Sequence, residues 1–540
     1  MNESESSGLL LSTMQDIPIT VRRIFDHGRD VHASSKIVTY RNGAREEVTF
    51  GDLAKDADGL ATALADLGVT AGDRVATLMW NQPEHLAVYF AATCSGAVVH
   101  PLNPRLTREQ LIEIMRLAQD RVLFVDDSML DLVAGIRAEV PTLKAIISIG
   151  GSGSSDYLEY EALRKTEGVV PRPDIDERAA AVLCFTSGTT GSPKGVAYSH
   201  RSLFLHTQAI STTNVYGIGQ PDSILLSVPI YHTNGASMPI AGWMAGARLV
   251  MPERNLQPLP MGEMIEREGV TLAVGVVTLW NDLLERWRTG LADLSSLRLV
   301  VSGGTASPRA LLQEFRDKGV PVIQGWGMTE SLGICTMGHP PAGVEESVIY
   351  DYLATGGRIV GGVRVRVRDV DTGVLQPHDG ESVGELEVEG PWITGGYVGR
   401  TEGDGLRDGW FRTGDIGTVT PDGYVRITDR LKDVIKSGGE WISSLDLEDA
   451  IRSHPAVRDV CVIGVPDERW QERPLAVVVG DVRVDDLVSW LKARVARWWI
   501  PERWVVVDEL PRTSVGKIDK RQVRRTYDDD SYALAPTAQN

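Results

Sequence analysis

The chain has 540 residues, which exceeds one ordinary hydrophobic core and predicts two to four structural units. Hydrophobic residues make up 42% of the chain and charged residues 24%, a balance typical of a globular protein. The formal net charge of −18 argues against nucleic acid as a general partner, although a local basic patch can still receive an anionic cofactor.

The cysteines and the apolar runs indicate the compartment. The cysteines lie far apart, so we expect buried free thiols rather than a disulfide framework or a metal site: Cys94, Cys184, Cys335 and Cys461. No apolar run approaches the roughly 18 residues that suggest a membrane-spanning helix, and the N-terminus lacks the basic head of a signal peptide. We therefore expect a cytoplasmic protein without a transmembrane segment.

Strands and helices are predicted to alternate over the first third of the chain. Apolar runs at 73–79, 97–101, 122–125 and 145–149 predict buried strands, and residues 50–67 and 82–95 have helical spacing. Two strand-like segments flank a turn at 41–44. This alternation is typical of a mostly parallel sheet with helices on its faces.

A loop of hydroxyls and glycines follows the apolar run at 179–185, which predicts a strand. Its residues are Thr186, Ser187, Gly188, Thr189, Thr190, Gly191 and Ser192. Such a cluster is ordinarily a surface turn, but a linker needs neither a preceding strand nor the exit Pro193-Lys194-Gly195. Glycine N–H groups and hydroxyls together make a donor cradle for phosphate oxygens, and Lys194 supplies a matching cation. Because Pro193 precedes the lysine, this is not a Walker loop.

The chain after the loop divides into three predicted parts. Strands of a second α/β unit are expected at 223–229, 247–251, 271–277, 298–302 and 320–324. From Thr355, alternating segments such as 363–368 and 384–389 predict a small antiparallel sheet or barrel. From Asp433, strands at 457–465 and 475–479 and a helix at 484–495 predict a small α+β unit.

Two glycine-containing segments, 302–305 and 324–330, follow predicted strands. Such glycines can form simple turns and Trp326 can be a core residue, but ligands of open α/β sheets bind at this edge. Thr329 and Glu330 supply a hydroxyl and a hard carboxylate, which suit a phosphate oxygen and Mg²⁺.

The phosphate loop and these motifs resemble the adenylate-forming superfamily of acyl-CoA synthetases, firefly-type luciferases and peptide-synthetase adenylation domains. The resemblance extends over roughly residues 30 to 525 through six separated motifs. It implies an α/β fold with a large N-terminal domain, residues 1–431, of two α/β subdomains and a small β-barrel. A mobile α+β C-terminal domain, residues 432–540, would follow.

The resemblance also implies roles for individual residues. Catalysis is carried over to Lys517, Glu330 and His232, with Glu330 also as the metal ligand. The ATP and AMP contacts are carried over to Thr186, Ser187, Gly188, Thr189, Thr190, Lys194, Gly304, Thr305, Gly325, Trp326, Thr329, Asp415 and Arg430. The hinge is Lys432, and the CoA-binding residues are Ser437, Gly438, Gly439, Glu440 and Trp441. The acyl pocket is carried over to Tyr231, Met238 and Trp243.

Read without the resemblance, several of these positions have ordinary explanations. A lone histidine such as His232 is usually a satisfied surface or core residue. An aspartate in a glycine-rich turn, such as Asp415, is usually a cap, and the mixed charges at 429–436 are typical of a solvated loop.

The implied reaction has two steps. Mg·ATP and a small-molecule carboxylic acid give acyl-AMP and pyrophosphate, and the thiol of CoA, the co-substrate, then displaces AMP. The motifs at 103–105, 324–330 and 437–441 are most similar to those of medium- and long-chain fatty acyl-CoA synthetases. Val277 stands where a proline is common and Glu389 where an arginine is common, so the acyl group is left open.

Other functions remain as alternatives. The chain can be a CoA ligase for a bulky secondary-metabolite acid, including one specialised for a single half-reaction. A carrier-loading adenylation enzyme is a rival, but no carrier domain follows Lys517. A non-catalytic nucleotide-binding regulator is expected to lose Lys517 or Glu330, and both are present. A homodimer is left open as the assembly.

Overall fold

The first α/β unit is built on a sheet of order β7-β6-β5-β3-β4-β8-β9. The computed structural model describes residues 12–533, except 152, 187–192, 305, 402–403, 438–439, 513–517 and 530. The strands are parallel except β9, which runs antiparallel to β8. Their bounds are β3 (Arg74–Leu78), β4 (Val98–Pro101), β5 (Asp120–Asp126), β6 (Ala145–Ile149), β7 (Leu158–Glu159), β8 (Ala180–Thr186) and β9 (Lys194–Ser199).

Helices cover both faces of this sheet, and their caps follow the sequence. Thr49 accepts a hydrogen bond from the Asp52 amide at the start of α2, and Thr107 caps α4 in the same way through Gln110. The helices are α2 (Phe50–Asp66), α3 (Pro83–Cys94), α4 (Arg108–Ala118), α5 (Leu130–Val133) and α6 (Tyr160–Leu163).

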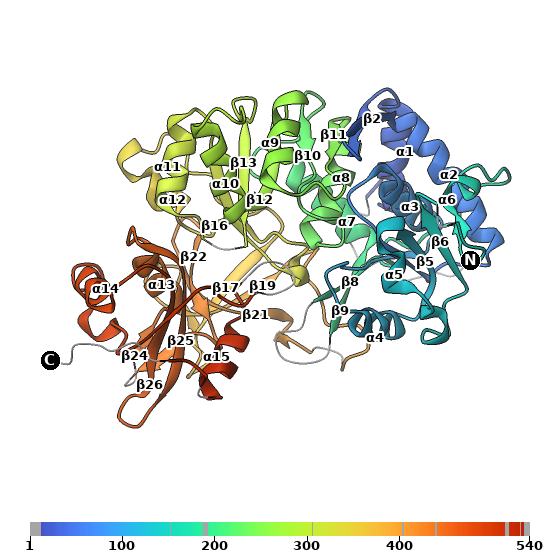
Figure 1. Cartoon of the computed structure of the whole chain (residues 1–540). Coiled ribbons are helices and arrows are strands. Elements are labelled where there is room, and N and C mark those ends of the chain that lie inside the picture. The colour runs from blue at the N-terminus through green and yellow to red at the C-terminus, as the bar shows by residue number, and fades with distance from the viewer. Residues whose placement is uncertain are drawn as a thin grey trace.

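The second α/β unit lies beside the first and is mostly green to yellow in Figure 1, with its N-terminal elements in blue. Its strands are β1 (Lys36–Arg41), β2 (Ala44–Thr49), β10 (Ser223–Leu225), β11 (Arg248–Met251), β12 (Leu272–Val276), β13 (Leu299–Gly303) and β14 (Val322–Trp326). Its helices are α1 (Val21–Val31), α7 (His200–Ser211), α8 (Thr233–Ala245), α9 (Pro258–Arg267), α10 (Val277–Arg288), α11 (Arg309–Asp317) and α12 (Ile349–Leu353). The hairpin β1–β2 confirms the predicted turn, and β1 pairs in parallel with β11 through Ile37 and Leu249.

An antiparallel part continues the second sheet. Strand β14 pairs with β15 through Gly325 and Met337, so both parts lie on one hydrogen-bonded path of strands. The strands are β15 (Thr336–Met337), β16 (Gly357–Ile359), β17 (Arg364–Arg368), β18 (Leu375–Gln376), β19 (Gly384–Glu389), β20 (Leu406–Arg407), β21 (Trp410–Val419) and β22 (Tyr424–Arg430).

The C-terminal part, orange to red in Figure 1, has its own sheet of order β24-β23-β26-β25, with β27 paired to β26. Its elements are β23 (Ile435–Ser437), β24 (Glu440–Ile442), α13 (Ser444–Arg452), β25 (Val457–Asp467), β26 (Gln471–Gly480), α14 (Val484–Leu491), β27 (Arg503–Val507) and α15 (Lys520–Asp528). Helix α13 docks on β22, because the Ser443 hydroxyl donates to the Thr428 carbonyl and the Ser444 amide donates to Asp429, each at 2.6 Å. The predicted fold class, a mixed α/β N-terminal region and a separate C-terminal unit, is confirmed.

All four cysteines are buried free thiols, as predicted. Within the described ranges, no helix is long and apolar enough to span a bilayer.

Candidate active site

Three separated motifs meet where strands β14, β21 and β22 lie together. The indole Nε1 of Trp326, at the end of β14, donates to Oδ2 of Asp415 at 2.7 Å. The Arg430 guanidinium lies 2.6 Å from Oδ1 of the same carboxylate, because Asp415 and Arg430 are register partners on β21 and β22. Asp415 is only 2% exposed, and these two donors hold its carboxylate in place. Each carboxylate oxygen has two lone pairs and can accept more than one hydrogen bond.

Glycines set the position of Trp326. A Cβ on Gly327 would lie 2.1 Å from the Gly333 carbonyl oxygen, so only glycine lets the following loop fold back so closely. A Cβ on Gly325 would lie 2.9 Å from the carbonyl oxygen of Thr336 on the neighbouring strand β15. The glycines on either side of Trp326 therefore let neighbouring backbone segments pack closely against this part of the chain.

A second cluster forms around the exit of the phosphate loop. Lys194 opens β9 opposite Thr186, and its ammonium lies 4.4 Å from the centre of the Tyr397 ring. The Tyr397 hydroxyl donates to Oε1 of Glu330 at 2.7 Å. Burial, followed by the Glu330 charge, raises the pKa of Tyr397, which keeps the phenol protonated as a donor. The sequence analysis did not single out Tyr397, although its place after Gly395-Gly396 was an available signal.

Backbone hydrogen bonds tie this cluster together. The Thr394 amide donates to the Glu330 carbonyl at 2.7 Å, and the Val398 amide donates to the Gly195 carbonyl at 2.8 Å. The Tyr198 hydroxyl donates to the Thr329 carbonyl at 2.7 Å. The segment 391–398, which we call the strap, thus joins β9 to the turn that carries Glu330.

Glu330 fits a magnesium ion that is held mainly by substrate. Among the described residues, no cluster of three or more histidine, cysteine or carboxylate side chains is placed to hold a metal. Mg²⁺ usually binds one or two protein carboxylates together with substrate phosphates and water. A single hard carboxylate beside a phosphate loop meets that requirement.

The acyl-pocket candidates lie at the start of α8 and along it. His232 is exposed at the N-cap of the helix, and Tyr231 is half-buried with a pKa raised by burial. Met238 is 3% exposed. A Cβ on Gly235 would lie 1.9 Å from the Pro229 carbonyl oxygen, so glycine brings the helix close to the preceding loop.

Trp243, also assigned to the acyl pocket from the sequence, has the surroundings of a core residue. Its ring stacks 4.2 Å from Phe50, lies 4.9 Å from Phe90 and 5.9 Å from Phe25, and its Nε1 donates to the Phe25 carbonyl. Its exposed fraction is 0%. Trp243 therefore packs α8 against α1, α2 and α3.

The hinge and the CoA segment lie just after β22. Lys432 is in the turn between β22 and β23, and burial lowers the pKa of its ammonium. Ser437 accepts a hydrogen bond from Arg473 at 3.0 Å, and the Lys436 ammonium lies 5.6 Å from the Trp441 ring centre. Arg473, which the sequence analysis did not name, also donates to the Trp498 carbonyl and so anchors this segment within the C-terminal part.

Several predicted site residues lie outside the described residues: Ser187, Gly188, Thr189, Thr190, Thr305, Gly438, Gly439 and Lys517. Gly304 is described at the end of β13, and its φ of 93° is accessible mainly to glycine. Glu440 begins β24.

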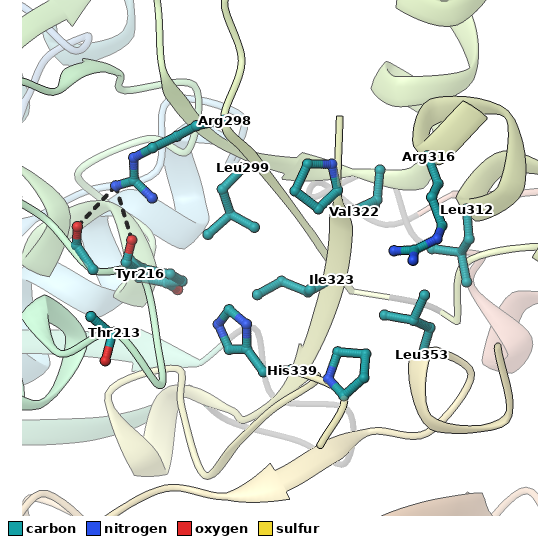
Figure 2. A pocket seen from close by; sticks show the side chains of 13 residues that line it. Thr213, Tyr216, Arg298, Leu299, Leu312, Arg316, Val322, Ile323, His339 and Leu353 are labelled. Atoms are coloured by element: carbon teal, nitrogen blue, oxygen red, sulfur yellow. Dashed lines mark hydrogen bonds between the residues drawn. The ribbon is translucent and has the colours of Figure 1, made fainter. Parts of the chain in front are cut away.

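A cavity of about 410 Å³ opens at the N-terminal ends of strands β13 and β14, at the opposite end of these strands from the candidate site (Figure 2). Arg298 lines it, donates to the Tyr216 and Gly217 carbonyls and pairs with Asp222, while Arg316 pairs with Glu346. Both guanidinium charges are thus compensated, and this cavity is separate from the clusters at the strand ends.

Comparisons with known proteins identify the family to which the chain is similar. A family model described as AMP-binding enzyme matches residues 26–398, and one described as AMP-binding enzyme C-terminal domain matches 446–517. A long-chain-fatty-acid–CoA ligase of Thermus thermophilus is 39% identical, over 97% of this chain and 98% of that protein. A 3-methylmercaptopropionyl-CoA ligase of Ruegeria lacuscaerulensis is 38% identical, over 96% of this chain and 99% of that protein. The crystal structure of the anthranilate CoA ligase AuaEII in complex with anthranoyl-AMP matches with a TM-score of 0.86 at 26% identity, covering 96% of this chain and 99% of that one.

Proposed function

The chain belongs to the AMP-binding enzymes and is an AMP-forming acyl-CoA ligase that uses ATP and CoA, and we propose that its acid is a medium- or long-chain fatty acid. The observation that carries the site assignment is the meeting of Trp326, Asp415 and Arg430. These residues come from three motifs that the sequence separates widely, and their convergence supports one nucleotide site.

In this proposal the Asp415 carboxylate binds the ribose hydroxyls of ATP, and Arg430 holds it in position. Gly325 and Gly327 set the position of the Trp326 indole, which the purine would contact. Thr186, Lys194 and the loop between them bind the phosphates at the other end of the site. Glu330 and the β- and γ-phosphates would hold Mg²⁺, which neutralises charge on the pyrophosphate leaving group.

The first half-reaction joins two anions. A carboxylate oxygen of the acid attacks the α-phosphorus, the bond to the bridging oxygen breaks, and pyrophosphate leaves with the electron pair. Lys517 is proposed to contact both partners and so to reduce their repulsion. In the second half-reaction the CoA thiol loses its proton and attacks the acyl carbon, and AMP leaves.

The two half-reactions are proposed to use two orientations of the C-terminal domain, which begins at Lys432. Rotation at the hinge would exchange the Lys517 face for the Ser437–Trp441 face. The bonds from α13 to Thr428 and Asp429 span this hinge, so they belong to one orientation. Lys432 lies in the short turn between β22 and β23, which supports its role as the pivot.

The similar proteins and the residues of α8 support an alkyl chain as the acyl group. Met238 is an apolar residue of α8, and the half-buried Tyr231 precedes that helix beside His232 in the chain. We assign Met238 and Tyr231 to the wall of a pocket for an alkyl chain. A short sulfur-containing acid is a second candidate, because the 3-methylmercaptopropionyl-CoA ligase is as similar as the fatty-acid ligase.

A panel of acids tests the proposal. Octanoate, dodecanoate and hexadecanoate are compared with 3-methylmercaptopropionate and anthranilate, and AMP and CoA thioester are quantified for each. We expect the highest kcat/KM with the alkyl acids, and one molecule of CoA thioester formed for each AMP released. A higher kcat/KM with 3-methylmercaptopropionate would make that acid the proposed substrate instead. Release of AMP without formation of thioester would favour a carrier-loading enzyme.

A further inference from the structure

Tyr397 stands between the two charged side chains of the phosphate end. Its ring faces the Lys194 ammonium at 4.4 Å, and its hydroxyl donates to the Glu330 carboxylate at 2.7 Å. Lys194 and Glu330 form no ion pair within 4 Å with each other or with any other described residue. A lysine and a glutamate joined through one tyrosine are thus kept close without direct contact.

A direct Lys194–Glu330 pair would oppose ATP binding. The lysine has to reach a phosphate and the glutamate has to reach a divalent cation, so ATP would first have to separate the two charges. The phenol gives each group a weaker partner instead. One hydrogen bond to Oε1 leaves the other lone pairs of the carboxylate available, and a ring face holds an ammonium without neutralising it.

The strap fixes Tyr397 in this place. Its bonds from Thr394 to the Glu330 carbonyl and from Val398 to the Gly195 carbonyl tie the backbone on both sides of the tyrosine. The Phe411 ring packs against the Tyr397 ring, with the ring centres 6.3 Å apart and the planes at 72°. The phenol therefore has a defined position relative to both charged groups.

We propose that Tyr397 is a positioning residue for the β- and γ-phosphates of ATP, which holds Lys194 and Glu330 apart and ready until Mg·ATP binds. This inference rests on the roles proposed above for Lys194 and Glu330. Tyr397 would act through these two residues. Substituting it should therefore weaken the binding of nucleotides that carry the β- and γ-phosphates and leave the affinity for AMP unchanged.

Equilibrium binding of α,β-methylene-ATP with Mg²⁺, and of AMP, tests the inference by calorimetry. Tyr397→Phe keeps the ring and removes the hydroxyl, whereas Tyr397→Leu removes both. We expect the affinity for the ATP analogue to fall about fivefold in the first variant and about tenfold or more in the second. The affinity for AMP stays within about twofold in both, which also reports an intact fold.

Two further variants distinguish failure of the Tyr397 inference from failure of the site assignment. Tyr350 has Arg309 4.9 Å from its ring centre, so Tyr350→Phe is a matched control and leaves both affinities unchanged. If Lys194→Ala weakens the analogue but the Tyr397 variants do not, the inference fails while the site assignment stands. If Lys194→Ala also has no effect, the site assignment itself fails. Equal losses for AMP and the analogue, or tighter analogue binding in Tyr397→Phe, would overturn the positioning role.

Discussion

Asp415 is the side chain on which the nucleotide site depends most. It is almost fully buried, and Trp326 and Arg430 both donate to its carboxylate. A buried carboxylate that an indole and a guanidinium hold in place suits the recognition of a pair of hydroxyls.

Asp415→Asn should therefore weaken AMP binding. The amide cannot accept as strongly and leaves Arg430 without its counter-charge, so we expect a loss of about 10- to 100-fold in affinity. Calorimetry with AMP measures it. Asp422→Asn, on the exposed turn between the same two strands, is the matched control and should change nothing. Unchanged AMP affinity in a folded Asp415→Asn protein would remove Asp415 from the site.

Helix α8 carries both the proposed acyl wall and part of the core. Trp243 and Met238 occupy the same helix, and the sequence pattern alone does not distinguish a pocket tryptophan from a core one. The difference arises from α1 and α2, whose Phe25 and Phe50 enclose Trp243 from distant parts of the chain.

Trp243→Ala should lower the free energy of unfolding by about 3–5 kcal/mol, because it leaves a cavity among three phenylalanines. The ranking of fatty-acid chain lengths should stay as in the wild type. Met238→Ala, in contrast, should shift that ranking toward longer or bulkier acids. Denaturant titration and the acid panel measure both variants. A changed ranking without lost stability in Trp243→Ala would return Trp243 to the pocket.

Helix α7 contains a histidine that folding keeps uncharged. His206 is 1% exposed, its ring meets Trp392 edge-on at 5.7 Å, and burial lowers its pKa to about 3. Neither ring nitrogen has a hydrogen-bond partner among the described residues. The unfolded chain binds a proton at this residue near pH 6.5, whereas the folded chain does not.

The free energy of unfolding should therefore fall as pH decreases from about 6.5 toward 3, by up to about 1.4 kcal/mol per pH unit for this residue. Its contribution is complete above pH 6.5. His206→Phe should make the slope shallower, and His378→Phe, on an exposed loop, serves as the control. Urea titrations at several pH values provide the slopes. An identical slope in His206→Phe would show that His206 is charged or exposed in the folded protein.

Local pattern predicted most of the elements but not their partners. The bounds of β19 and β6 match the predicted segments, since apolar periodicity and flanking glycines or turns are local features. The pairing of β1 with β11 joins segments about 200 residues apart, and no local signal specifies it. The meeting of Trp326 with Asp415 and the place of Tyr397 depend on the same long-range folding. The sequence motifs therefore predicted most of the candidate site residues, whereas the contacts between their side chains are seen only in the tertiary structure.

The two proposed half-reactions require the C-terminal unit to take two orientations. In the observed one, α13 is docked on β22, and Arg524 of α15 pairs with Asp433 beside the hinge. These contacts would have to separate or shift when the unit rotates about Lys432.

Lys432→Pro should trap the C-terminal unit in one orientation. Proline fixes its own φ and restricts Leu431 before it. We expect one half-reaction to fall strongly and the other to continue, as measured by pyrophosphate release and by thioester formation from supplied acyl-AMP. If both rates stay close to those of the wild type, the hinge lies elsewhere.

The most direct measurement of the two-step account compares the same half-reactions in Lys517→Ala. The lysine is proposed to act only where carboxylate and α-phosphate approach each other. The account predicts that pyrophosphate release with ATP and acid is nearly abolished, while supplied acyl-AMP still reacts with CoA at close to the wild-type rate. Equal loss of both half-reactions in a stably folded variant, or full pyrophosphate release without Lys517, would contradict it.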